Sequence, residues 1–221
     1  MTNTLHRRGS ASALKNDYVI FCTMAKGINS EGSGPKIQEF IRICLKYNPV
    51  NMGDSDMGNI LQEDVGVQKF LADRADGQGA AAVFTDLDTL QRVIEELIRA
   101  DLGISINVSG LLNEVQGCCR KAGIERHSVE HSLGILGAID RLPEREILEV
   151  NSLCGHGMVS FNLIRKMVEY VKLRRLTPQK AANIMAKCCE CGAFNPVRAE
   201  QLLEKMVGSM ERGGYDQRKQ G

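Results

Sequence analysis

The chain has 221 residues, of which 43% are hydrophobic and 25% charged, and these proportions exclude a wholly disordered chain. The formal net charge of +1 provides no global field for nucleic acid or an anionic membrane, and an aromatic content of 5% without Trp offers few stacking surfaces for single strands. No apolar run is long enough to span a bilayer, and no export signal follows His6, Arg7 and Arg8, so we expect a soluble cytoplasmic protein whose eight cysteines are reduced.

The first half of the chain alternates strand and helix patterns. Residues 1–16 are polar and basic and predict a flexible arm. Residues 18–25 are continuously apolar and rich in β-formers, which predicts a buried strand. Further strands are predicted over 80–85 and 104–108. Each of the three is followed by a helix pattern, and the irregular, glycine-rich stretch 51–79 predicts a lid or binding loop.

The second half is predicted to be helical throughout. Its candidate helices span 128–141, 143–150, 157–174, 178–188 and 196–211. The fold class is therefore α/β, with α+β as the alternative: a small sheet of about three to four strands flanked by helices, followed by an all-helical half rich in Cys and His. The expected division is an α/β part over 17–124, a helical part over 125–212 and a polar tail over 213–221, with both parts compatible with one continuous domain.

Cysteine and histidine gather in the second half of the chain, where six of the eight cysteines and three of the four histidines lie. Thiolates and imidazoles are the ligands of zinc, and thiolates hold iron–sulfur clusters. The clearest pattern is the C-x-x-C pair Cys188 and Cys191, where a helix gives way to a turn containing Gly192. This pair predicts either metal ligation or dithiol redox chemistry, with core packing as the competing interpretation.

A second pattern is Cys154-Gly155-His156 directly before a predicted helix. A thiol at a helix N-terminus has a lowered pKa, and His156 is placed to pair with Cys154 or to join it on a metal. The three residues resemble the motif around a catalytic cysteine of the proline racemase family, in which the thiol acts as an acid or base; Cys154 is the matching position. Nothing in this chain matches the second cysteine motif of that family, so the resemblance supports only a reactive thiol.

Two further groups are weaker candidates. His127 and His131 stand four residues apart and would share one face of a helix, which predicts a metal-binding pair. Free N–H groups at the start of the helix after the first strand predict an anion or substrate site. Its residues are Lys26, Gly32, Ser33, Gly34 and Lys36. Cys22, Cys44 and one of the pair Cys118 and Cys119 are expected to be core residues.

The sequence predicts a metal- or thiol-dependent cytoplasmic enzyme acting on a small molecule. In this hypothesis Cys154 and His156 are catalytic, and the cofactor is zinc or an iron–sulfur cluster. A substrate that binds an α/β sheet should do so at the C-terminal ends of the strands, which places residues 25–34, 85–86 and 109–110 on one rim. The alternative is a non-catalytic metal or redox sensor, or an accessory protein with a structural metal site. A homo-oligomer is compatible with either; a membrane is not expected, and the near-neutral charge argues against nucleic acid.

Overall fold

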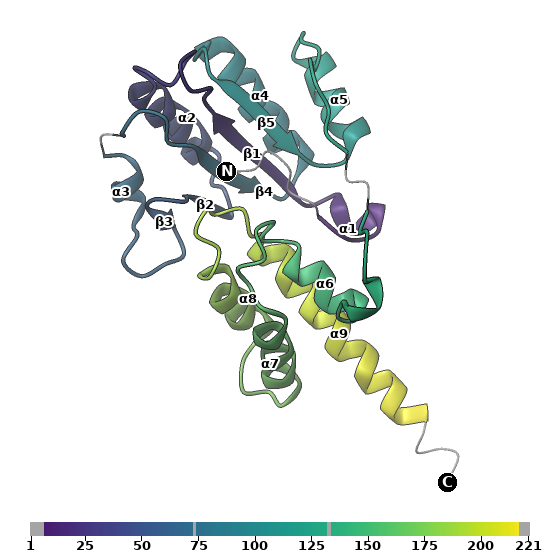
Figure 1. Cartoon of the computed structure of the whole chain (residues 1–221). Coiled ribbons are helices and arrows are strands. Elements are labelled where there is room, and N and C mark those ends of the chain that lie inside the picture. Colours follow the sequence, from purple (N-terminus) through teal and green to yellow (C-terminus); the bar gives the residue numbers. More distant parts are fainter. Residues whose placement is uncertain (1–6, 73, 132–133, 217–221) are drawn as a thin grey trace.

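A computed structural model describes residues 7–72, 74–131 and 134–216, with side chains as far as Gly208. In this part of the chain a five-stranded antiparallel sheet lies beside a bundle of helices, as Figure 1 shows. The strands are β1 (Tyr18–Thr23), β2 (Asn51–Asp54), β3 (Gly58–Asn59), β4 (Ala80–Phe84) and β5 (Ser105–Ser109). The principal helices are α2 (Gly34–Lys46), α4 (Leu87–Ala100), α5 (Leu112–Lys121), α6 (Arg145–Asn151), α7 (Phe161–Lys172), α8 (Pro178–Ala186) and α9 (Pro196–Asp216). Short helical turns form α1 (Ala11–Leu14), α3 (Val67–Phe70) and the 3₁₀ turn Ile139–Arg141.

The sheet has the strand order β3-β2-β4-β1-β5. Without the two-residue strand β3, this is the split β-α-β topology of ferredoxin-like folds, with α2 and α4 as the crossover helices. The predicted mixed fold is confirmed, and the sheet has five strands instead of three to four.

The antiparallel pairing corrects the predicted substrate rim. The start of β1 pairs with the ends of both β4 and β5, as Tyr18 opposite Phe84 and Val19 opposite Ser109 show. Residues 25–34 follow β1 and therefore lie at the opposite end of the sheet from residues 85–86 and 109–110. The apolar run in β1 indicates that the strand is buried on both faces of the sheet. Such burial occurs in parallel and in antiparallel sheets, so it does not determine strand direction.

Each face of β1 belongs to a different core. Tyr18, Ile20 and Cys22 pack with α2 and α4 on one face. Val19 and Phe21 point to the other face, where they share a core with helices α6 to α9. The sheet and the helical half therefore bury one continuous apolar interior between them.

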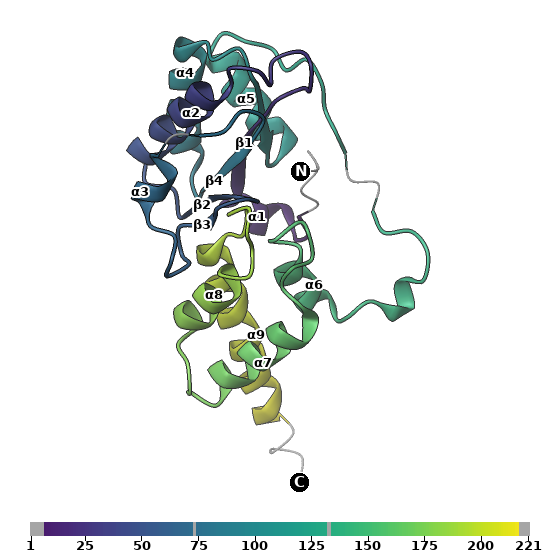
Figure 2. The same cartoon turned by 60° about the vertical axis from the view of Figure 1, so that its left-hand side comes forward.

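The predicted helix over 128–141 is wrong for the residues that the structure describes. Residues 124–131 and 134–138 have no helical structure, and only the 3₁₀ turn at Ile139–Arg141 follows. Gly134 and Gly137 have φ angles of 92° and 96°, which no α-helix contains. In Figure 2 the described residues 134–144, which lead into α6, form an arch that stands away from the body of the molecule.

No described helix combines the length and the apolar composition that crossing a bilayer requires.

Candidate metal centre

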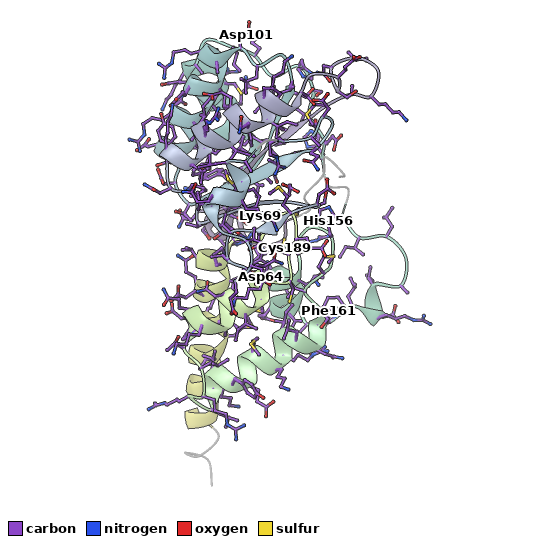
Figure 3. The ribbon with its side chains drawn as sticks, turned by 90° about the vertical axis from the view of Figure 1, so that its left-hand side faces the viewer. Asp64, Lys69, Asp101, His156, Phe161 and Cys189 are labelled. Carbon is purple, nitrogen blue, oxygen red and sulfur yellow. The ribbon has the colours of Figure 1, made fainter. Side chains whose placement is uncertain are left out.

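Two connections between helices bring cysteines together beside the edge of the sheet. Cys154 and His156 lie in the connection from α6 to α7, and Cys189 and Cys191 in the connection from α8 to α9. Figure 3 shows Cys189 and His156 near the level at which the sheet and the helices meet. Residues more than thirty positions apart in sequence therefore form one cluster, as the sequence hypothesis of a shared centre requires.

The four side chains form a continuous series of contacts. Cys154 is hydrogen-bonded to Cys189, the sulfur atoms of Cys189 and Cys191 are 3.8 Å apart, and Cys191 Sγ is 3.4 Å from Nδ1 of His156. Cys154 and Cys189 are 0% exposed and Cys191 is 4% exposed, whereas His156 is exposed. The cluster is therefore a buried group of three sulfurs with one imidazole on its solvent side.

Cys188, which the C-x-x-C pattern singles out, lies outside this series of contacts. Its thiol donates to the carbonyl of Ile184 four residues earlier at 3.8 Å, as in a last helical turn, and the residue is half-buried. Cys189 lies one position beyond that turn and contacts Cys191. The two cysteines in contact are thus Cys189 and Cys191, with a C-x-C spacing. The sequence does not reveal this choice, because it depends on the residue at which α8 ends.

Hydrogen bonds divide the protons unequally among the three thiols. The pKa of Cys154 is lowered to about 6, first by the hydrogen bond with Cys189 and then, against the effect of burial, by the backbone N–H groups of His156 and Met158. The pKa of Cys191 is also lowered to about 6, first by its hydrogen bond with Cys189. The same bonds raise the pKa of Cys189. Two sulfurs therefore favour the thiolate, the form that binds metals.

The sheet edge holds the α8–α9 connection through side-chain amides. Asn59 Nδ2 donates to the carbonyl of Cys189 at 2.8 Å, and Gln62 Nε2 donates to that of Lys187 at 2.8 Å. Asn51 Nδ2 donates to the carbonyl of Phe194 at 2.9 Å. These three residues position the cysteines, but their stretch of sequence is irregular and carries no signal that pairs it with residues 187–194.

An arginine from the arm holds both connections from another side. The guanidinium of Arg7 donates to the carbonyls of Leu153 and Ala193, and its Nε lies 3.0 Å from a carboxylate oxygen of Asp17. Arg198 contacts the same carboxylate at 2.6 Å. The arm predicted to be flexible is therefore held to the body of the protein at Arg7, and this residue joins the backbone beside Cys154 to the backbone beyond Cys191.

Gly192 allows the cysteine connection to touch the backbone of β2. Its φ is 71°, and an added Cβ would lie 2.2 Å from the nitrogen of Gly53 and 2.3 Å from the carbonyl carbon of Met52. Both atoms belong to the sheet and cannot rotate away. Only glycine fits at this position, directly after Cys191.

Replacing Gly192 by alanine will lower the free energy of unfolding by about 3 kcal/mol or more, because a left-handed backbone costs about 1–2 kcal/mol and the overlap with β2 adds to it. Urea unfolding followed by circular dichroism measures this change. The matched control is Gly117→Ala in α5, where nothing lies within 4 Å of the added Cβ. This variant should gain about 0.5–1 kcal/mol, since alanine favours a helix. Equal stability of the two variants would contradict the close approach.

The predicted histidine pair is part of a different surface. His127 and His131 are both exposed, and without a helix they do not share the face that the spacing implies. They line a hollow of about 420 Å³ together with Asn107 and Arg126. None of the four residues of the cysteine cluster lines that hollow.

The predicted anion site is filled by the protein itself. The carboxylate of Asp76 accepts hydrogen bonds from the backbone N–H groups of Gly34 and Gly32, each at 2.8 Å, and these bonds lower the pKa of Asp76. Ser33 Oγ accepts from the N–H of Gly77 at 2.8 Å. Of the two lysines, Lys26 is exposed and Lys36 is half-buried. The loop therefore uses its anion-binding geometry to hold residues 76–77.

Within the described residues, no group of three or more His, Cys, Asp or Glu side chains is placed so that it could hold a metal ion, so the cluster rests on pairwise contacts alone. Comparisons with protein-family models, with curated proteins and with solved structures give no match for this chain.

Proposed function

We propose that this chain is a zinc-binding protein in which Cys154, His156, Cys189 and Cys191 hold one structural zinc ion. The observation that carries the proposal is the spacing of the contacting atoms. Zinc–sulfur and zinc–nitrogen bonds of about 2.3 and 2.05 Å in a tetrahedron separate two sulfurs by about 3.8 Å and a sulfur and a nitrogen by about 3.6 Å. The corresponding separations are 3.8 Å for Cys189 and Cys191 and 3.4 Å for Cys191 and His156.

The donor set favours zinc over an iron–sulfur cluster. Three sulfurs and one imidazole nitrogen make a Cys₃His set, a common composition of structural zinc sites. In a four-iron cluster each iron takes one thiolate, so the cysteine sulfurs stand farther apart than the 3.8 Å between Cys189 and Cys191. Cys154 and Cys191, whose pKa values are lowered, favour the thiolate, whereas Cys189, whose pKa is raised, has to lose its proton to the incoming ion.

Burial favours a structural ion over a catalytic one. A catalytic zinc keeps one coordination position open for water or substrate, whereas four protein ligands close the site. Cys154 and Cys189 are completely buried, and neither the hollow beside His127 nor the one at the α7–α8 turn is lined by any of the four ligands. The ion would thus fasten two helix connections to each other and, through Asn59, to the sheet edge.

The test is metal analysis of the full chain, produced without a polyhistidine tag and purified under anaerobic conditions. We expect about one zinc ion per chain and a colourless protein. Replacement by cobalt should give the intense visible bands of a tetrahedral thiolate site. Removal of the metal with a chelator should lower the melting temperature, and zinc should restore it.

Two results would overturn the proposal. Brown protein with iron and sulfide would identify a cluster in place of zinc. Metal-free protein that binds neither zinc nor cobalt, and whose melting temperature zinc leaves unchanged, would show that these thiols only pack in the core.

A further inference from the structure

Unpaired cations gather at the turn between α7 and α8. Residues 161–187 contain seven basic side chains and a single acidic one, Glu169. Arg165 and Lys187 are paired with carboxylates of other segments. In the described part of the chain no ion pair involves the other five, which are Lys166, Lys172, Arg174, Arg175 and Lys180. The net charge of +1 conceals this concentration, because the remainder of the chain is net acidic.

The fold presents these cations at one end of the molecule. The α8–α9 connection contacts the sheet edge, so the N-terminal end of α8 points away from the sheet, as Figures 1 and 2 show. All five cations are exposed. Arg174, Arg175 and Lys180 border a hollow of about 340 Å³ at the turn. Lys166 and Arg175 lie over the ring of Tyr170, at 5.5 and 5.8 Å from its centre, which restricts their motion.

The backbone at Arg174 provides an independent observation. Its φ is 55°, and the N–H of Arg175 bonds to the carbonyl of Tyr170 at 2.8 Å, which is the pattern of a helix end that usually carries glycine. The other described non-glycine residues with positive φ are Asn48 and Asp101, whose short polar side chains tolerate this region. Within the described residues no ion pair of the Arg174 side chain offsets this conformation, and strained residues of this kind concentrate at functional sites.

We propose that the α7–α8 turn binds the phosphate backbone of a nucleic-acid duplex. Arginine forks match phosphate oxygens, and duplex-binding surfaces are polar and strongly positive. A protein interface needs an apolar centre with aromatic or aliphatic anchors. The turn offers a single large apolar side chain that is more than half exposed to solvent, Leu173 at 51%. The surface is therefore suited to a regular array of phosphates and not to an apolar partner. This inference does not depend on the zinc ion.

The experiment measures the anisotropy of labelled duplexes of about 20 base pairs, DNA in one arm and RNA in the other, titrated with the full chain. At about 50 mM salt we expect micromolar binding, weakened about 500-fold at about 200 mM salt if all five cations contact phosphates. Preference for one duplex identifies the form recognised. Arg174→Gln/Arg175→Gln should lower affinity at least about tenfold and reduce the salt slope by about two.

Two variants separate binding from folding. Arg174→Gly removes one charge and the backbone strain, so it should weaken binding while raising the melting temperature by about 2–4 °C. Arg120→Gln/Lys121→Gln removes two exposed charges from α5 and should leave affinity within about twofold. The proposal is overturned if neither duplex binds at low salt, if the α5 variant loses as much affinity as the α7–α8 variant, or if anionic vesicles bind and duplexes do not.

Discussion

For the zinc site proposed above, we expect replacement of Cys189 by serine to abolish stoichiometric zinc binding and to lower the melting temperature of the zinc-loaded protein by roughly 8–16 °C. A thousandfold loss of metal affinity removes roughly 4 kcal/mol of stability when zinc is in excess, and a protein of this size loses roughly 2–4 °C per kcal/mol. The effect should be large because Cys189 contacts both Cys154 and Cys191 and is completely buried. Zinc content by mass spectrometry and differential scanning calorimetry measure the two changes.

The adjacent cysteine provides the control. Cys188→Ser alters the same chemical group one residue away, where the thiol donates to the carbonyl of Ile184 and interacts with Cys154 only electrostatically. We expect unchanged zinc content and a loss of less than about 1 kcal/mol. If Cys188→Ser releases the metal and Cys189→Ser does not, the C-x-x-C interpretation from the sequence is the right one and the cluster described here is not the site.

Replacing Asp17 by alanine will lower the free energy of unfolding by about 3–5 kcal/mol. Its carboxylate contacts Arg7 Nε at 3.0 Å and Arg198 Nη1 at 2.6 Å, and none of the three side chains is more than 5% exposed. The substitution leaves two guanidinium groups buried without their shared counter-charge, which costs more than the pair itself contributes. Urea unfolding, with the same slope for both proteins, measures the difference.

The exposed pair Arg42–Glu39 is the comparison. Its side chains are 49% and 40% exposed and 3.5 Å apart, so Glu39→Ala should cost less than about 0.5 kcal/mol. If Asp17→Ala costs as little as Glu39→Ala, the two arginines find water or other partners when the carboxylate is removed. The contacts of Asp17 with Arg7 and Arg198 would then not anchor the arm.

The local sequence pattern was sufficient to predict those helices and strands that carry their own apolar periodicity. The strands β1, β4 and β5 and the helices α7, α8 and α9 lie where the sequence predicts them, to within a few residues at each boundary. Strands β2 and β3 were missed because Asn, Gly and Asp dominate them, residues that local preference disfavours in strands. They exist because β4 pairs with β2 and because Gly53 packs against Gly192. Both contacts are long-range.

The candidate centre was likewise predictable from the sequence only in part. The residue types and the two connections were predictable, since Cys and His are concentrated there. The choice of Cys189 over Cys188 was not, because it depends on the residue at which α8 ends. The contributions of Asn59 and Arg7 were also not predictable, since amide-to-carbonyl and guanidinium-to-carbonyl bonds leave no periodic trace in a sequence.

The interior shared by the sheet and the helical half determines where this chain can be divided. A truncation that ends before α6 would expose the face of the sheet that carries Val19, Phe21 and Val83, and such a fragment would self-associate. Proteolytic cleavage within residues 134–142 should leave that shared interior covered, because this segment is not part of it: Leu136 and Ile139 are 85% and 61% exposed. The two pieces would stay together as a non-covalent heterodimer.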